Sequence, residues 1–159
     1  MFTSRVYTRS TFILTCSLVL TACTGARPYN LGVVNSTLTP CPDTPNCVSS
    51  DSLDESHYVP AFKLEASSEQ VWSEIKLYLD SQSNMVIVRE LDDYLYVEST
   101  SMFMRFVDDF ELHLREENGI IAVRSASRYG KSDFGVNKER VDALYLYLSE
   151  KGLVSEAIR

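Results

Sequence analysis

The segment from Arg124 to Asn137 holds the side chains best suited to chemistry. Three cations and three serine hydroxyls lie within nine residues, 124 to 132, after an apolar stretch and before a helical one. Guanidinium groups beside the free backbone amides of a helix N-terminus favour binding of an anion. The alternative is that Arg124 and Arg128 pair with neighbouring carboxylates and tie the loop to a sheet. Because acidic residues outnumber basic ones, we favour the ion pairs over the anion site.

Two adjacent carboxylates, Asp108 and Asp109, lie in the clearest strand pattern of the chain, residues 103–115. Neighbours in a strand point to opposite faces, so this pair cannot share a proton. Asp108 falls on the apolar face, where a charge needs a partner, and we expect that partner to be Arg124 or Arg128. We therefore expect Asp108→Ala to lower stability and Asp109→Ala to leave it unchanged.

Nucleophilic catalysis has little support, because a serine or cysteine nucleophile needs a base and the chain has only His57 and His113. We expect His113 to be solvated on the polar face of the 103–115 strand, and His57 to make a hydrogen bond within a turn. Two histidines also supply few ligands for a metal. The sequence predicts no catalytic residue, no metal site and no cofactor.

The first residues have the order of an export signal. Met1–Arg9 carries two arginines and no acid, and residues 11–22 are mostly apolar. The uncharged span between Arg9 and Arg27 is 17 residues. A membrane-spanning helix needs roughly 20 mostly apolar residues, so the pattern favours a signal peptide over a permanent span.

The stretch Leu20-Thr21-Ala22-Cys23 resembles a bacterial lipobox. This predicts a lipoprotein signal peptide over residues 1–22 and a diacylglyceryl group, with palmitate among the acyl chains, on Cys23. The alternatives are an ordinary cleaved signal with a chance cysteine, or an uncleaved anchor. Thr24 stands where an aspartate would hold such a protein at the inner membrane. For a Gram-negative source we therefore expect an exported lipoprotein on the outer membrane, facing the periplasm.

The remaining chain is predicted to contain one domain. Residues 23–39 are rich in Gly, Pro and Asn and predict a lipid-anchored flexible linker. Residues 40–152 have the composition of one globular domain, and residues 153–159 are expected to be a C-terminal tail. The 15 basic and 22 acidic side chains leave a net charge of −7, which argues against a nucleic-acid partner.

Cys41 and Cys47 remain as an even pair in an oxidising compartment, where a disulfide is the simplest interpretation. A metal site is the first alternative, but it would need further cysteine or histidine ligands. A redox pair is the second, but a thioredoxin-like pair would have two residues between the cysteines.

The order of the predicted elements indicates the fold class. A capping box, Ser67 with Gln70, opens a helix, and Asn118-Gly119 is a strong hairpin signal. Consecutive strands pair antiparallel, and two helices must cover their apolar face. The order β-α-β-β-β-β-α predicts an α+β two-layer sandwich, with a mainly antiparallel sheet of about five strands, two helices on one face and the other face polar. The predicted strands are 58–64, 85–90, 94–99, 103–115 and 120–127, and the predicted helices are 68–82 and 136–151, the second capped by Asn137.

Three motifs together resemble a bacterial and plastid family, DUF1499, of no established activity. They are Cys41-Pro-x-x-Pro-Asn-Cys-Val-Ser-Ser50, Arg105-Phe-Val-Asp-Asp109 and Arg124-Ser-x-Ser-Arg128-x-Gly-x-Ser-Asp-Phe-Gly-Val-Asn137-x-x-Arg140. The resemblance covers about residues 38–150 and implies one domain. It draws attention to Asn46, Ser49, Ser50, Arg105, Asp108, Asp109, Arg124, Ser127, Arg128, Asp133 and Asn137. Of these, Arg105, Asp108, Asp109, Arg124, Ser127, Arg128, Asp133 and Asn137 form the expected cluster, either an anion site or structural ion pairs.

These observations favour an uncharacterised cell-envelope lipoprotein whose domain is a non-enzymatic binding or interaction module. Its expected partners are the membrane, through the anchor, and an envelope protein or a small anionic ligand; the oligomeric state stays open. The alternative is an envelope hydrolase or transferase that holds an anionic substrate with the 124–137 loop. A helix-grip-like ligand carrier is a third hypothesis, which rests on Ser68–Trp72 opening a helix before several strands.

Overall fold

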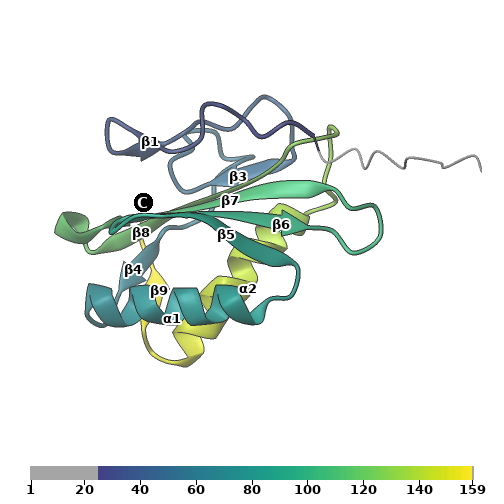
Figure 1. The fold of residues 1–159 in the computed structure, drawn as a ribbon. Coiled ribbons are helices and arrows are strands. Elements are labelled where there is room, and N and C mark those ends of the chain that lie inside the picture. The colour runs from purple at the N-terminus through teal and green to yellow at the C-terminus, as the bar shows by residue number, and fades with distance from the viewer. Residues whose placement is uncertain (1–24, 159) are drawn as a thin grey trace, which may run out of the picture.

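Alternating apolar side chains build the central strands of the structure, a computed structural model that describes residues 25–158. Four strands form an antiparallel meander in the order β5-β6-β7-β8 (Figure 1). The turn between β7 and β8 contains a 3-10 turn over Glu116–Asn118 and ends on Gly119, whose φ of 63° suits glycine. The strands are β5 Met85–Glu90, β6 Tyr94–Thr100, β7 Val107–Arg115 and β8 Ile120–Ser127.

The outer edge of β8 is shared by two short strands. The strand β3, Cys47–Ser49, pairs with residues 124–126, and β4, Phe62–Leu64, pairs with residues 120–121. A last strand, β9, Val154–Glu156, lies outside β4. All of these pairs are antiparallel, which completes a seven-stranded sheet.

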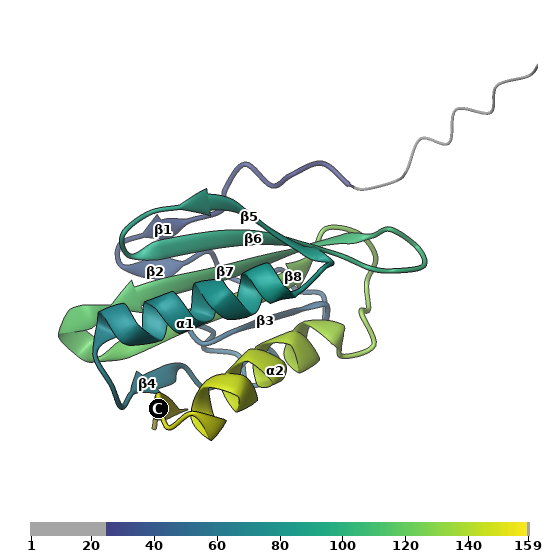
Figure 2. The same ribbon diagram turned by 60° about the horizontal axis from the view of Figure 1, so that its bottom comes forward.

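Both helices cover the same face of this sheet (Figure 2). The helix α1, Ser68–Ser81, begins where the Ser67 hydroxyl accepts a hydrogen bond from the Gln70 amide, as the capping box predicts. The helix α2, Val136–Glu150, packs beside it. The core between helices and sheet contains Val71, Trp72, Ile75 and Leu79 of α1, Val141, Leu144 and Leu148 of α2, and Phe110, Leu112, Ile121 and Val123 of the sheet.

The opposite face of the sheet is covered by the N-terminal segment, residues 25–57, apart from its strand β3, which belongs to the sheet (Figure 1). Its first part forms a small hairpin from β1, Val33–Val34, and β2, Thr37–Leu38. Leu38 is buried against Tyr94, Tyr96 and Ala122 of the sheet. The sheet is therefore covered on both faces.

The α+β class, the antiparallel sheet and the two helices on one face are confirmed. The sheet has seven strands instead of about five, because β3 and β9 add to its edge. The face expected to be open and polar lies under the N-terminal segment. None of the helices in residues 25–158 is long and apolar enough to span a membrane.

Two predicted domain boundaries differ from the structure. Residues 25–39, expected to be part of a flexible linker, lie on the sheet, where the Gly32 amide donates to Glu111 at 2.8 Å. The expected tail from residue 153 instead contributes β9, with Leu153 and Val154 buried. The folded unit thus extends at both ends of the predicted range 40–152, while the predicted signal peptide and Cys23 lie outside the described residues.

Candidate functional site

Three arginine–carboxylate pairs are buried at the sheet and contain four of the eight residues of the expected cluster. Every side chain in these pairs is at most 10% exposed. The pairs are Arg124–Glu111, Arg128–Asp109 and Arg140–Asp108, with N–O distances of 2.9, 2.8 and 2.7 Å. Two of them lie on the face under the N-terminal segment, and the third faces α2.

The pair on the helix face continues into a network of amide and hydroxyl groups. Arg140 donates to the Ser125 hydroxyl at 2.7 Å and to the Asn137 side-chain oxygen at 2.6 Å. Asn137 is fully buried, and its amide nitrogen donates to the Ser127 hydroxyl and to the Asn46 carbonyl. Each of these polar groups has its partner, so the network binds α2 to β8 and β3.

The partner of Asp108 and the cap of α2 both differ from expectation. Asp108 does face inward, but it pairs with Arg140 of the helix instead of Arg124 or Arg128. The cap position of α2 is occupied by Gly135, at a φ of 88°, while Asp133 accepts from the Asn137 backbone amide at 2.9 Å. Asn137 is therefore a buried bridge and not the helix cap.

On the other face, Asp109 lies between two donors. The guanidinium of Arg128 and the hydroxyl of Tyr96 both donate to Asp109, each within 2.8 Å. Arg128 also pairs with Glu98. The Glu98 carboxylate forms a second salt bridge, with Arg27 of the N-terminal segment at 2.7 Å. Burial opposes the charge of Arg128, but its bonds to Asp109 and Glu98 outweigh this and raise its pKa. Burial, followed by the bond to Asp109, raises the pKa of Tyr96.

Glu111 is the most buried carboxylate of the sheet and receives three donors. They are the Tyr94 hydroxyl at 2.7 Å, the Gly32 amide at 2.8 Å and Arg124 at 2.9 Å. Burial and the neighbouring Glu111 charge raise the pKa of Tyr94. Within residues 25–158, the Nε of Arg124 is the one buried side-chain nitrogen or oxygen without a hydrogen-bond partner.

His113 is buried on this face and is not solvated as expected. Its Nδ1 accepts a hydrogen bond from Arg115 at 3.2 Å. Burial, and secondly the charge of Arg115, lower the pKa of the ring. Arg115 also pairs with Asp51, which accepts the Leu38 amide at 2.8 Å. The buried ring is therefore held next to the contacts that secure the N-terminal segment.

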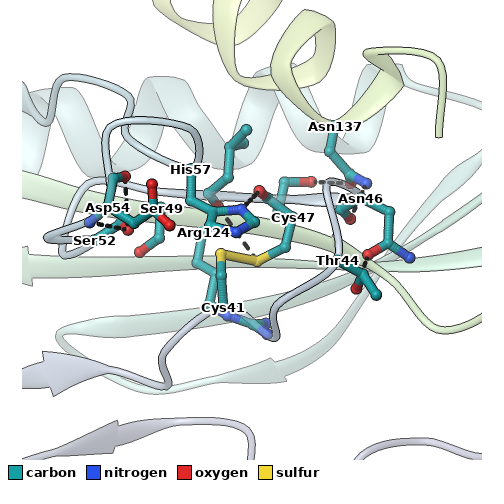
Figure 3. Close-up of a disulfide and its surroundings, with 12 residues drawn as sticks. Cys41, Thr44, Asn46, Cys47, Ser49, Ser52, Asp54, His57, Arg124 and Asn137 are labelled. Carbon is teal, nitrogen blue, oxygen red and sulfur yellow. Dashed lines mark hydrogen bonds between the residues drawn. A yellow bond between two sulfur atoms is a disulfide. The ribbon is translucent and has the colours of Figure 1, made fainter. Parts of the chain in front are cut away.

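The predicted disulfide between Cys41 and Cys47 is confirmed (Figure 3). His57 lies in a turn, where its backbone amide donates to the Asp54 carbonyl at 3.1 Å, and its ring Nδ1 lies 2.8 Å from the carbonyl oxygen of Cys47, ten residues earlier. The neighbouring Asn46 donates to the Gly130 carbonyl at 2.8 Å. The disulfide loop thus holds both the start of β3 and the loop that follows β8. In the described part of the chain, no three metal-ligating side chains come together.

The structure brings seven of the eight residues of the expected cluster to these networks, and Arg105 is the exception. Arg105 is exposed in the 101–106 loop, because the strand expected from residue 103 begins at Val107. Ser49 and Ser50 hold β3 in place, the latter by accepting the Val123 amide at 2.9 Å. Sequence reasoning missed the roles of Tyr94, Tyr96, Glu98 and Arg140, although Arg140 follows Asn137 at helical spacing.

The model of a protein family described as "Protein of unknown function (DUF1499)" matches residues 37–148. The chain belongs to this family. No curated protein and no solved structure matches it significantly. The DUF1499 match includes the disulfide and all three arginine–carboxylate pairs. In this DUF1499 domain, Arg124, Arg128 and Arg140 neutralise carboxylates, and Ser125 and Ser127 bond to Asn137 instead of to a base. The third serine of the 124–137 motif, Ser132, accepts the Phe134 amide.

Proposed function

We propose that this chain is an exported lipoprotein, held at the cell envelope by acyl chains on Cys23. For a Gram-negative source the proposed site is the outer membrane, on its periplasmic side. The order of basic residues, apolar run and lipobox-like cysteine supports this proposal. The Cys41–Cys47 disulfide is compatible with an oxidising compartment beyond the cytosol.

We propose further that the DUF1499 domain is a non-catalytic binding module. The observation that carries this proposal is the neutralisation of Arg124, Arg128 and Arg140 by buried carboxylates within hydrogen-bonding distance. A clamp for an anionic substrate needs guanidinium groups that face an open site. The hydrolase or transferase alternative therefore has less support than a structural role for the motif.

The anchor is tested by the intact mass of the full-length protein purified from its native host. We expect loss of residues 1–22 and a mass increase for a diacylglyceryl group and any further acyl chain. Cys23→Ala abolishes both changes, whereas the matched variant Cys16→Ala, within the leader, keeps them. A protein that retains Met1 and carries no acyl chain contradicts the proposal.

The proposal that the domain has no clamp for an anionic substrate is tested by thermal unfolding with inorganic phosphate as the anion. A ligand that binds the folded state raises the melting temperature. We expect phosphate to raise it no more than sulfate at equal ionic strength, because both salts act by general exclusion. A larger rise that Arg124→Gln removes would support the anion clamp and contradict a purely structural role.

A further inference from the structure

Two exposed apolar loops project from one end of the domain. The first, residues 101–106, connects β6 to β7, and the second, residues 128–135, connects β8 to α2. Phe103 is 91% exposed and Phe134 is 94% exposed. Scattered apolar residues on a surface are ordinary, but a contiguous group of large ones marks an interaction site. The group, here called the loop end, also includes exposed Met102, Met104 and Tyr129.

The two loops face one another across a shared hollow of about 620 Å³. The rings of Phe106 and Tyr129 stack across it with centroids 5.9 Å apart. Arg105 and Phe134 adopt left-handed backbone conformations, with φ of 57° and 56°, that non-glycine residues rarely take. The lining is dominated by Met102, Phe103, Met104, Phe106, Tyr129 and Phe134.

The described chain begins at the same end of the molecule. Both ribbon views show the start of the N-terminal segment beside the two loops (Figures 1 and 2). Gly25 lies against Arg128 of the second loop, since a Cβ on Gly25 would be 3.0 Å from the Arg128 Cβ. Cys23 is two residues earlier. Two residues span at most about 7 Å, so the proposed acyl group on Cys23 would be attached within about that distance of Gly25.

The charge of the loop end also differs from that of the whole chain. The chain has a net charge of −7, yet the two loops carry Arg105, Lys131 and one acidic residue, besides Arg128, whose charge is neutralised by Asp109 and Glu98. The acid, Asp133, accepts hydrogen bonds from the backbone amides at the start of α2, while Arg105 and Lys131 are exposed. Exposed aromatic and apolar tips flanked by cations suit the boundary between acyl chains and anionic headgroups.

We propose that the loop end docks into the lipid bilayer, with Phe103 and Phe134 inserted among the acyl chains and Arg105 and Lys131 at the headgroups. The inference rests on the proposed lipid anchor, which would hold this end of the molecule at the membrane surface. It goes beyond the anchor because it fixes the orientation of the domain. The helices and the sheet then stand above the membrane, with the Asn118-Gly119 turn farthest from it.

The test places a tryptophan in the loop end and measures its contact with lipid. The full chain carrying Phe103→Trp is reconstituted with vesicles of phosphatidylethanolamine and phosphatidylglycerol, with or without bromine on the acyl chains. We expect its emission to shift to shorter wavelength and to be quenched by the brominated lipid. Phe134→Trp should behave in the same way. The native Trp72 is buried in the core, so the unsubstituted protein supplies the background.

Leu53→Trp is the matched control, because Leu53 is 92% exposed, as Phe103 is, but lies away from the loop end. It follows Asp51, which pairs with Arg115 at the opposite end of β7. We expect its emission to stay unshifted and unquenched. Equal quenching at residues 53 and 103, or none at either, overturns the docking proposal. A blue shift at residue 103 without bromine quenching also overturns it, because a second protein chain then covers the loops.

The mass of the same samples separates this proposal from the anchor. Acylated protein whose residue 103 is not quenched overturns docking and leaves the anchor standing. Protein without acyl chains whose residue 103 is still quenched supports docking and overturns the anchor. Protein without acyl chains and without quenching contradicts both.

Discussion

Among single residues, Asp108, Asp109 and Glu111 of β7 carry charges that are costly to bury. A buried charge is tolerated only when it is paired and hydrogen-bonded. Asp108, Asp109 and Glu111 each meet an arginine, and hydroxyl or amide donors complete the shells of Asp109 and Glu111. In this chain, Arg124, Arg128 and Arg140 thus act by neutralising the three buried carboxylates.

We expect Asp108→Ala and Asp109→Ala each to lower the free energy of unfolding by about 3 kcal/mol. The first leaves buried Arg140 without its counter-charge, and the second leaves Arg128 with the more exposed Glu98 alone and removes the acceptor of the Tyr96 hydroxyl. The measurement is urea unfolding at neutral pH. Asp142→Ala is the control, since its pair with Lys138 is exposed, and we expect a loss of less than about 1 kcal/mol. If Asp109→Ala matches Asp142→Ala, the sequence-based expectation for Asp109 holds and the buried pair contributes little.

A second residue-level prediction concerns pH and His113. Burial and Arg115 lower the pKa of this ring in the folded protein, so the unfolded chain takes up the proton more readily. Stability attributable to the neutral ring is therefore full above the unfolded pKa of about 6.5 and falls as the pH decreases below it. We expect the wild type to lose more stability between pH 7.5 and pH 5.5 than His113→Asn in urea unfolding. Equal losses would show that the ring does not contribute.

Among the elements, the N-terminal segment shows what local patterns miss. Its Gly, Pro and Asn residues and its lack of apolar periodicity predict a linker. Two-residue strands carry almost no local signal, and the contacts that hold the segment on the sheet come from Glu98 and Glu111, 71 and 79 residues along the sequence from their partners Arg27 and Gly32. Only the tertiary structure supplies those partners.

We expect Leu38→Ala to lower the free energy of unfolding by about 2–4 kcal/mol, because Leu38 is buried against the sheet face. The matched variant Val34→Ala, in the same hairpin but exposed, should change it little. Chemical unfolding of both variants checks this. If the two variants lose equal stability, the segment does not form a layer of the fold.

The elements that could be predicted are those with strong local signals. The capping box and the apolar spacing located α1, and the hairpin signal located the turn before β8. Alternation misplaced the start of β7, because the apolar residues 102–104 continue the pattern but face solvent. The residue type of Asn137 suggested a helix cap, yet burial among Ser125, Ser127 and Arg140 gives it another role.

At the scale of the whole molecule, seven of the eight residues of the expected cluster lie in the buried networks, but their pairing could not be predicted. Strand alternation correctly placed Asp108 on the helix face and Asp109 on the other. The partner of each aspartate depends on which arginine lies on its face of the sheet. Asp108 pairs with Arg140 of α2, which is 32 residues away in the sequence. The sheet face opposite the helices is buried by the N-terminal segment, whose sequence has no strong strand or helix pattern. The predicted two-layer sandwich therefore left this face exposed to solvent.

The whole molecule is also the scale at which the anchor and docking proposals combine. An anchor close to Gly25 and apolar loops at the same end would hold the domain in a single orientation on the membrane. A flexible linker over 23–39, as expected from the sequence, would have allowed every orientation. Because the N-terminal segment is ordered on the sheet, the proposed anchor would also determine which end of the domain faces the membrane.

The attachment of the N-terminal segment to β7 and β8 has a consequence for the timing of folding. Gly32 finds its acceptor only when residue 111 has been synthesised, and Cys47 finds its strand partner only at residue 126. Contacts between such distant parts of a chain form slowly. The N-terminal segment is synthesised before the sheet that it covers, and it is thus among the last parts of the domain to fold.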